Sequence, residues 1–422
     1  MSVAGVGTWL ATPLAAELTR SQARSIVLVL LASALGALLS RIHSWIVLPT
    51  VVLEIVLGIL IGPDVLDIAK GNTYITVLSN FGLSMLFFFA GLEVIEKKVS
   101  GRLLRLGTVG WTLSLGIGLV LGFVLQQAGL DAEWWLIGVA LATTALGTLV
   151  PILSDAGLLA TPLGSAILGT GVAGEFWPII FISVFLTSAY GAAKEVLLLL
   201  AFGVVVLLAA RIALRARPPR VLRVLQETVH TTGQAAVRTA IFLLAFLVLI
   251  ASDAGFEFVL GAFAAGLVVG LALDSPEGEV VRMRLEGIGF GFLIPIYFVV
   301  TGMTFDLDSL LTATGLALAG LFLALLLVTR GVSALLWLRQ LGRRETGGLA
   351  LCAATGLPLI VAIVGIGEGR GAISDALGAS LIGAGMISVL VYPLLAIKLV
   401  GRRDLPPAVE PAIVGEVETG EY

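Results

Sequence analysis

A series of long apolar segments covers nearly the whole chain and limits what it can fold into. Charged or Pro/Gly-rich connections separate thirteen such segments, at 25–40, 43–62, 75–95, 106–127, 134–153, 164–189, 194–213, 236–252, 256–273, 286–303, 310–338, 347–366 and 376–399. A helix of about 20 apolar residues spans a bilayer. Only 13% of the residues are charged, against about 25% in soluble domains. The sequence therefore predicts an all-α polytopic membrane protein with about thirteen transmembrane helices, embedded in a lipid bilayer.

The basic residues predict how the helices are oriented. Most of the 25 Lys and Arg residues fall in alternate connections, including 97–105, 211–223, 339–344 and 398–403. Cytoplasmic loops carry an excess of Lys and Arg, so we expect the N-terminus outside and the C-terminus inside. Residues 1–24 are then a short extracellular tail, 25–400 the transmembrane domain, and 401–422 a Pro- and Glu-rich, disordered cytoplasmic tail.

The two halves of the membrane domain, 25–189 and 236–399, resemble each other across a linker helix at 194–213. LFFFAGLE (86–93) matches IYFVVTGM (296–303), and ALATTALGTLVP (140–151) matches ALCAATGLPLIV (350–361). Both pairs lie seven helices apart, and this odd offset places the second half upside down in the membrane. Inverted repeats of this kind are typical of secondary transporters, with the substrate site near the midplane between the halves.

The second pair of matching segments predicts discontinuous helices. Each combines threonine and glycine with a nearby proline, and the positions that we expect to bind an ion or proton are Thr143, Thr144, Thr355 and Gly356. Non-helical backbone at membrane depth is tolerated only inside protein or beside a cavity. There the ends of half-helices offer partial charges to an ion. The alternative is that these threonines bond their own helix and the glycines only allow close packing.

Glu175 is the ionisable residue near the middle of the apolar segment 164–189. A carboxylate at that depth is costly unless it faces protein or water and has a partner. Pro178 has no N–H, so the carbonyl of Gly174 loses its helical partner. We expect Glu175, together with Gly174, to form an ion or proton site. The alternative is a structural glutamate that is paired to another helix.

Two further charges lie well away from the ends of predicted spans, Arg330 in 310–338 and Glu54 in 43–62. A buried Arg stays charged and needs a carboxylate or several carbonyls, and the candidate carboxylates are Glu175 and Glu54. Arg330 either holds Glu175 until a cation or proton displaces it, or braces the packing of helices. For Glu54 the choice is between ion-pair coupling and a structural role, and its helix favours the structural role.

Five segments resemble the sodium/proton exchanger domain, most closely the monovalent cation:proton antiporter-2 family. They are LPTVVLEIVLGILIGPDVL (48–66), LSNFGLSMLFFFAGLEV (78–94), TTALG (143–147), the helix around Glu175, and IPIYFVVTGMTFDL (294–307). The resemblance implies two six-helix inverted repeats, a homodimer with a scaffold and a mobile core, and crossed unwound helices at 143–147 and 354–358. It places the family's paired acids on Gly174 and Glu175 and its basic residue on Arg330. This chain departs from the family pattern in having Gly and then Glu.

The resemblance implies exchange of a monovalent cation, Na+ or K+, for protons by alternating access, in the plasma (inner) membrane of a bacterium. With Glu175 as the shared proton and cation site, one carboxylate carries one H+ or one cation, and exchange is electroneutral. The alternatives are an organic-anion transporter on the same fold and a non-transporting homologue with a sensor or partner role. No nucleotide loop, zinc spacing or nucleophile–base pair is present in the sequence. We therefore expect no enzyme activity, no cofactor and no nucleic-acid partner.

Overall fold

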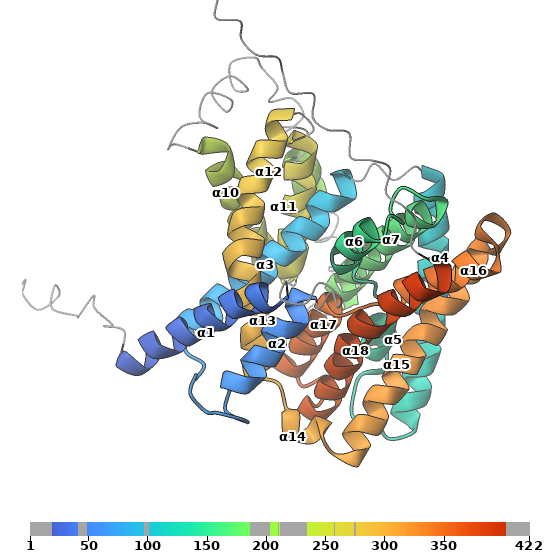
Figure 1. Ribbon diagram of the computed structural model, residues 1–422. Coiled ribbons are helices and arrows are strands. Elements are labelled where there is room, and N and C mark those ends of the chain that lie inside the picture. The colour runs from blue at the N-terminus through green and yellow to red at the C-terminus, as the bar shows by residue number, and fades with distance from the viewer. Residues whose placement is uncertain are drawn as a thin grey trace, which may run out of the picture.

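A computed structural model describes residues 19–40, 49–96, 101–185, 203–209, 211, 234–256, 258–273 and 276–401. These residues are almost entirely helical, as the sequence predicts, and the helices gather into two bundles that lie side by side (Figure 1). Contacts are dense within each bundle and sparse between them.

The first bundle, here the scaffold bundle, comprises the first three predicted spans of each half, and in the second half the third span consists of α12, η2 and α13. From the first half these are α1 (Arg20–Leu39), α2 (Thr50–Ile61) and α3 (Thr73–Glu96). From the second half they are α10 (Ala235–Asp253), α11 (Phe258–Ala272), α12 (Pro276–Ile288) and α13 (Ile294–Met303). A π-helical turn, η2 (Gly289–Leu293), joins α12 to α13.

The second bundle, here the core bundle, contains the discontinuous helices. From the first half come α4 (Gly101–Gln127), α5 (Trp134–Leu141), α6 (Leu146–Asp155) and α7 (Pro162–Phe185). After a short α14 (Leu307–Leu310), the second half adds α15 (Ala313–Ala334), η3 (Leu335–Trp337), α16 (Leu338–Ala353), α17 (Pro358–Gly369) and α18 (Asp375–Val400).

The packing partners repeat between the halves. Helix α2 packs on α13, and its counterpart α11 packs on α3, which is the counterpart of α13. Likewise α4 contacts α5 and α7, while α15 contacts α16 and α18. The last helix of each half also contains a proline, Pro178 in α7 and Pro393 in α18. This correspondence confirms the internal repeat that the sequence predicts.

Glycines allow the closest of these contacts. Gly58 of α2 lies against the backbone of Val299 in α13, and Gly266 of α11 lies against the backbone of Phe88 in α3. A Cβ at either position would collide with a carbonyl oxygen of the neighbouring helix. Close approach through small residues is how membrane helices gain packing energy where lipid supplies no hydrophobic drive.

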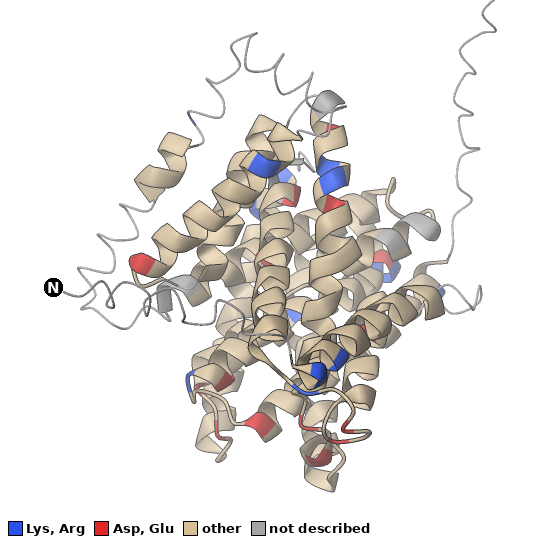
Figure 2. Cartoon of the chain, turned by 90° about the vertical axis from the view of Figure 1, so that its left-hand side faces the viewer, with Lys and Arg blue, Asp and Glu red and all other residues tan. Residues whose placement is uncertain are grey.

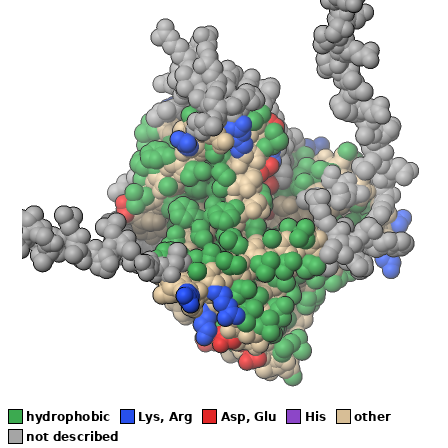
Figure 3. Space-filling model, turned by 60° about the vertical axis from the view of Figure 1, so that its left-hand side comes forward, with side chains coloured by type: hydrophobic (Ala, Val, Ile, Leu, Met, Phe, Trp, Pro, Cys, Tyr) green, Lys and Arg blue, Asp and Glu red, His purple; other side chains and the backbone are tan. Residues whose placement is uncertain are grey.

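The distribution of side chains fits a bilayer. Charged residues lie mainly toward the two ends of the molecule (Figure 2), and hydrophobic side chains form a broad band between them on the face shown in Figure 3. Within the described residues, eight helical segments are long and apolar enough to cross a membrane, and three shorter apolar helices accompany them. Of the predicted span 194–213 the structure describes only 203–209 and 211, so the count of thirteen stays a prediction.

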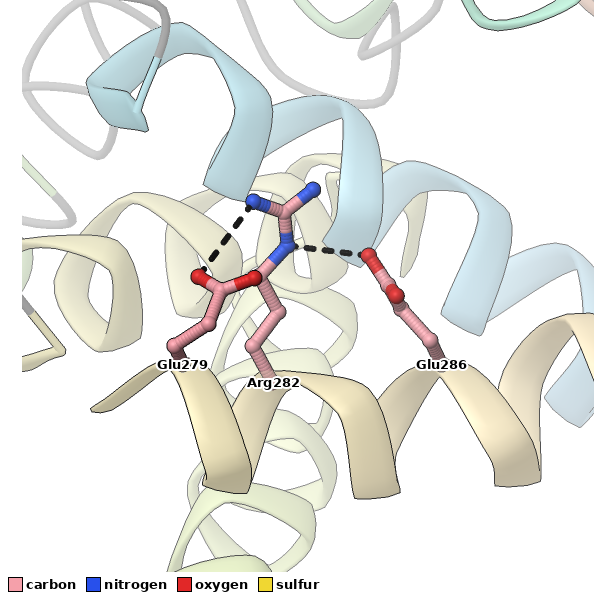
Figure 4. Close-up of polar contacts among 3 residues, drawn as sticks. All are labelled: Glu279, Arg282 and Glu286. Atoms are coloured by element: carbon pink, nitrogen blue, oxygen red, sulfur yellow. Dashed lines mark hydrogen bonds and ion pairs between the residues drawn. The ribbon is translucent and has the colours of Figure 1, made fainter. Parts of the chain in front are cut away.

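One charged group runs along α12. Arg282 donates from Nε to Glu286 at 2.9 Å, and its Nη1 lies 3.9 Å from Glu279 (Figure 4). Spacings of three and four residues place all three side chains on one helix face. This group therefore stabilises α12 locally, before the chain enters η2.

Candidate ion-binding site

The two helix breaks cross each other inside the core bundle. The chain leaves the helix at 142–145, between α5 and α6, and again at 354–357, between α16 and α17. The amide of Ala145 donates to the carbonyl of Thr355 at 2.7 Å, which joins the two breaks directly. Gly356 leaves room for Thr143, because a Cβ there would come within 2.9 Å of the threonine Oγ1. The crossed, discontinuous helices of the predicted fold are thus present.

Glu175 belongs to α7, and its carboxylate lies at the start of the half-helix α6. Its Oε1 accepts hydrogen bonds from the amide of Leu146 at 2.6 Å and the amide of Gly147 at 3.3 Å. The first N–H groups of a helix have no intrahelical partner and carry the positive end of the helix dipole. The break between α5 and α6 therefore creates a binding place for an anion, and the carboxylate of Glu175 occupies it.

The carbonyl of Gly174 is engaged by the protein. Pro178 is inside α7, and proline cannot donate to the carbonyl four residues earlier. That carbonyl instead accepts the amide of Thr144 at 3.1 Å. We expected this oxygen to help bind a cation. In this conformation it ties α7 to the break between α5 and α6.

Arg330 is fully buried at the same crossing, and neutral oxygens surround its guanidinium. Four acceptors receive its N–H groups: Ala353 O at 3.3 Å, Ser114 Oγ at 3.2 Å, Thr144 Oγ1 at 2.8 Å and Thr170 O at 3.3 Å. These groups come from four separate parts of the core bundle. Of the two roles considered for Arg330, this geometry favours bracing.

The two buried charges are matched to opposite ends of the broken helices. The carboxylate of Glu175 lies at the N-terminus of α6, whereas Arg330 donates to Ala353, the last residue of α16. Helix C-termini carry the negative end of the dipole. Each charge is thus stabilised by a half-helix end, and neither requires the other as its partner.

The geometry also explains why position 174 has no side chain. A Cβ built on Gly174 would lie 2.7 Å from Thr144 Oγ1 and 2.9 Å from Arg330 Nη2. The space that a second acid would need is filled by the groups that hold the crossing together.

A cavity of about 490 Å³, here the Glu175 cavity, lies between the two bundles. Glu175 and Thr148 line it from the core bundle, and Glu54 and Glu93 line it from the scaffold bundle. The π-helical turn η2 contributes Phe290, Gly291 and Phe292 to its wall. No Lys, Arg or His is among its described lining residues.

A second cavity of about 600 Å³, here the Glu368 cavity, lies at the other end of the same helices. Helix α3 lines the Glu175 cavity from 86 onward and the Glu368 cavity from 79 to 83. Helix α13 runs the opposite way, with 294–295 beside the first cavity and 300–304 beside the second. The adjacent residues Tyr297 and Phe298 line opposite cavities, so α13 separates the two at this level. The equivalent helices α3 and α13 are therefore antiparallel, as an inverted repeat requires.

Other residues predicted for the site do not line the Glu175 cavity. The hydroxyl of Thr144 joins the two breaks, whereas the hydroxyls of Thr143 and Thr355 bond their own helices, which was the alternative for these threonines. Thr143 donates to Ala140 O, Thr144 donates to Ala353 O, and Thr355 donates to Leu351 O. The amide of Gly356 donates to Ser388. Thr148 lines the cavity together with Glu175 but is not among the site residues predicted from the sequence. Its position at the start of α6, one residue after Gly147, was the available signal.

Comparison with known proteins agrees with this architecture of an inverted-repeat membrane transporter. The family described as "Sodium/hydrogen exchanger, transmembrane" matches residues 26–399. The chain belongs to this family.

Individual relatives cover most of the chain. YjbQ of Bacillus subtilis, named as a candidate Na+/H+ antiporter, is 29% identical over 403 residues, which is 90% of this chain and 64% of that protein. Antiporter 3 of Methanocaldococcus jannaschii, also named as a candidate Na+/H+ antiporter, is 26% identical over 359 residues, 82% of this chain and 89% of its own length. The chain thus spans a little under two thirds of the Bacillus protein.

A solved structure, that of the sodium proton antiporter MjNhaP1 from M. jannaschii, has the same fold. It aligns with a TM-score of 0.63 and 21% identity, over 89% of this chain and 99% of that one.

Proposed function

We propose that this chain is a secondary transporter that exchanges a monovalent cation, Na+ or K+, for protons. Glu175 is the shared site, because its carboxylate lies at the helix break between α5 and α6 and the residue lines a cavity between the bundles. A proton or a cation on Glu175 cancels its charge and lowers the cost of moving the site through the apolar zone. Thr148 lines the same cavity. Its hydroxyl donates to the carbonyl of Ala145 at 2.9 Å, and the lone pairs of that oxygen are the neutral ligand that we propose for the cation.

Alternating access follows from the two cavities. Glu175 lines only one of them, and the partition around Tyr297 and Phe298 separates it from the other. A displacement of the core bundle against the scaffold bundle exposes Glu175 to the opposite side. When neither a proton nor a cation is bound, the carboxylate keeps its hydrogen bonds to α6.

The resulting exchange is one H+ for one cation, since Gly174 supplies no second acid. We infer from the basic connections that the Glu175 cavity opens to the cytoplasmic side of the plasma membrane. The family resemblance supports a homodimer as part of this proposal.

The absence of basic groups from the described lining of the Glu175 cavity argues against the organic-anion alternative. Anionic substrates need Arg, Lys or several donors in the site. Arg330 is enclosed by oxygens of the core bundle and is not among the lining residues.

The test is a pH-dye assay in proteoliposomes on addition of Na+, K+ or Li+. We expect wild type to respond to at least one cation, without strong dependence on membrane potential. Glu175→Gln removes the charge at nearly constant shape, and we expect exchange to fall by at least about 100-fold. Glu93→Gln, an acid in the same cavity, is the matched control and is expected to retain exchange. Normal exchange by Glu175→Gln would exclude this site, and exchange strongly driven by a membrane potential would exclude one-for-one stoichiometry. A silent wild-type protein would favour the non-transporting homologue.

A further inference from the structure

Glu54 is a buried carboxyl on the scaffold side of the Glu175 cavity. It lies in the middle of α2 and is 3% exposed. Its side chain passes over Gly36 of α1, where an added Cβ would come within 3.0 Å of its Cγ. The scaffold bundle thus provides a fitted space for this glutamate.

No hydrogen bond or ion pair joins Glu54 to another described residue. The helices packed against α2 are α1 and α13. Among the described residues, the other ionisable groups that line the cavity are Glu93 and Glu175, both acids. A carboxyl in an apolar wall without a counter-charge is costly unless it holds a proton or meets water. At the Glu175 cavity, which it lines, Glu54 can hold a proton and can also contact water. Its volume is large enough for a chain of water molecules, each of which occupies about 30 Å³ in the liquid.

We propose that Glu54 is a fixed proton relay, which passes protons through cavity water between the cavity mouth and Glu175. The proposal rests on the proposed function and adds a second carboxyl to it. In the relay step an O–H bond of Glu54 breaks and the proton moves to water, while water gives a proton to the Glu175 carboxylate as the bound cation leaves. Glu54 is then protonated again from water at the mouth, so the step balances.

The relay differs from a second transport site because of its location. Glu54 belongs to the scaffold bundle, whereas Glu175 belongs to the core bundle that carries the crossing. A carboxyl on the scaffold stays on its side when the core bundle moves. Exchange therefore remains one-for-one, although two carboxyls take part.

The test separates proton delivery from cation movement. Glu54→Gln keeps the shape and removes the exchangeable proton, while Glu54→Asp keeps the acid on a shorter side chain. We expect Glu54→Gln to slow the maximal rate of Na+/H+ exchange at least about tenfold, with little change in the apparent KM for Na+. Glu54→Asp is expected to recover part of this rate. Exchange of radioactive Na+ for unlabelled Na+ at equal pH on both sides needs no proton and is expected to stay within about twofold of wild type. If K+ is the carried cation, Rb+ replaces Na+ as the tracer.

Two outcomes overturn the relay. Equal loss of Na+/H+ and Na+/Na+ exchange shows that Glu54 supports the structure only. If Glu93→Gln, which changes the matched acid in the same cavity, lowers the Na+/H+ exchange rate as much as Glu54→Gln does, the rate depends on the charge in the cavity and not on the position of Glu54. Failure of the proposed function has a different signature, since the wild-type protein then shows neither Na+/H+ nor Na+/Na+ exchange.

Discussion

Glu175 and Arg330 are two charged side chains beside the same helix break, and their surroundings differ in one respect. Both are stabilised by the end of a half-helix, α6 for the carboxylate and α16 for the guanidinium. Glu175 also lines a cavity, whereas Arg330 is wholly enclosed and donates to four fixed oxygens. Access to a cavity, rather than burial of charge, therefore distinguishes Glu175, which is suited to exchange, from Arg330, which is suited to hold helices together.

The largest expected effect on stability comes from removing the guanidinium of Arg330. Arg330→Met keeps most of the volume but removes every N–H donor, and each hydrogen bond from a charged group contributes about 1.5–3 kcal/mol. We expect a loss of at least about 3 kcal/mol, measured as thermal unfolding in detergent by tryptophan fluorescence. Glu175→Gln keeps an acceptor for the two amides of α6, so its Tm is expected to stay within about 2 °C of wild type. The reverse order of stabilities would contradict the comparison.

A side chain at position 174 tests how tightly the two regions are packed together. Gly174→Ala adds a Cβ that comes too close to Thr144 and Arg330. Overpacking of this kind costs about 2 kcal/mol, and we expect both the Tm and the exchange rate to fall. Gly365→Ala in α17 is the control, because a Cβ there meets no atom within 4 Å. If both variants behaved like wild type, the crossing would be looser than the structure shows.

The smallest effect is expected at the hydroxyl that joins Arg330 to the break. Thr144→Val removes the Oγ1 that accepts from Arg330 and donates to Ala353. Because Nη2 of Arg330 keeps Thr170 O as an acceptor, the expected cost is about 1.5 kcal/mol, at the low end for a hydrogen bond from a charged group. Thr143→Val removes only a local bond to Ala140 and is expected to lower the Tm less. A larger effect of the Thr143 variant would show that the hydroxyl of Thr144 does not couple the arginine to the crossing.

Much of the fold was predictable because its signals are local. Apolar segments of bilayer length marked the helices, and Thr, Gly and Pro marked both breaks within a few residues. Glu175 was identifiable because a mid-span carboxylate is costly wherever the helix packs. The prediction that Pro178 removes the helical hydrogen bond to the carbonyl of Gly174 was correct. The amide of Thr144, which donates to that carbonyl instead, was not predictable from the sequence.

The sequence alone determined that this chain is a membrane protein with an internal repeat, two interrupted helices and one central acid. Tertiary structure decided which groups meet. Arg330 binds Ser114 and Thr144, which are 216 and 186 positions away in the chain, and no periodicity encodes such a pairing. It also decided that the N-terminus of α6, and not Arg330, holds the carboxylate of Glu175. The same holds for Glu54, which shares a cavity with Glu175 only because the two bundles lie side by side.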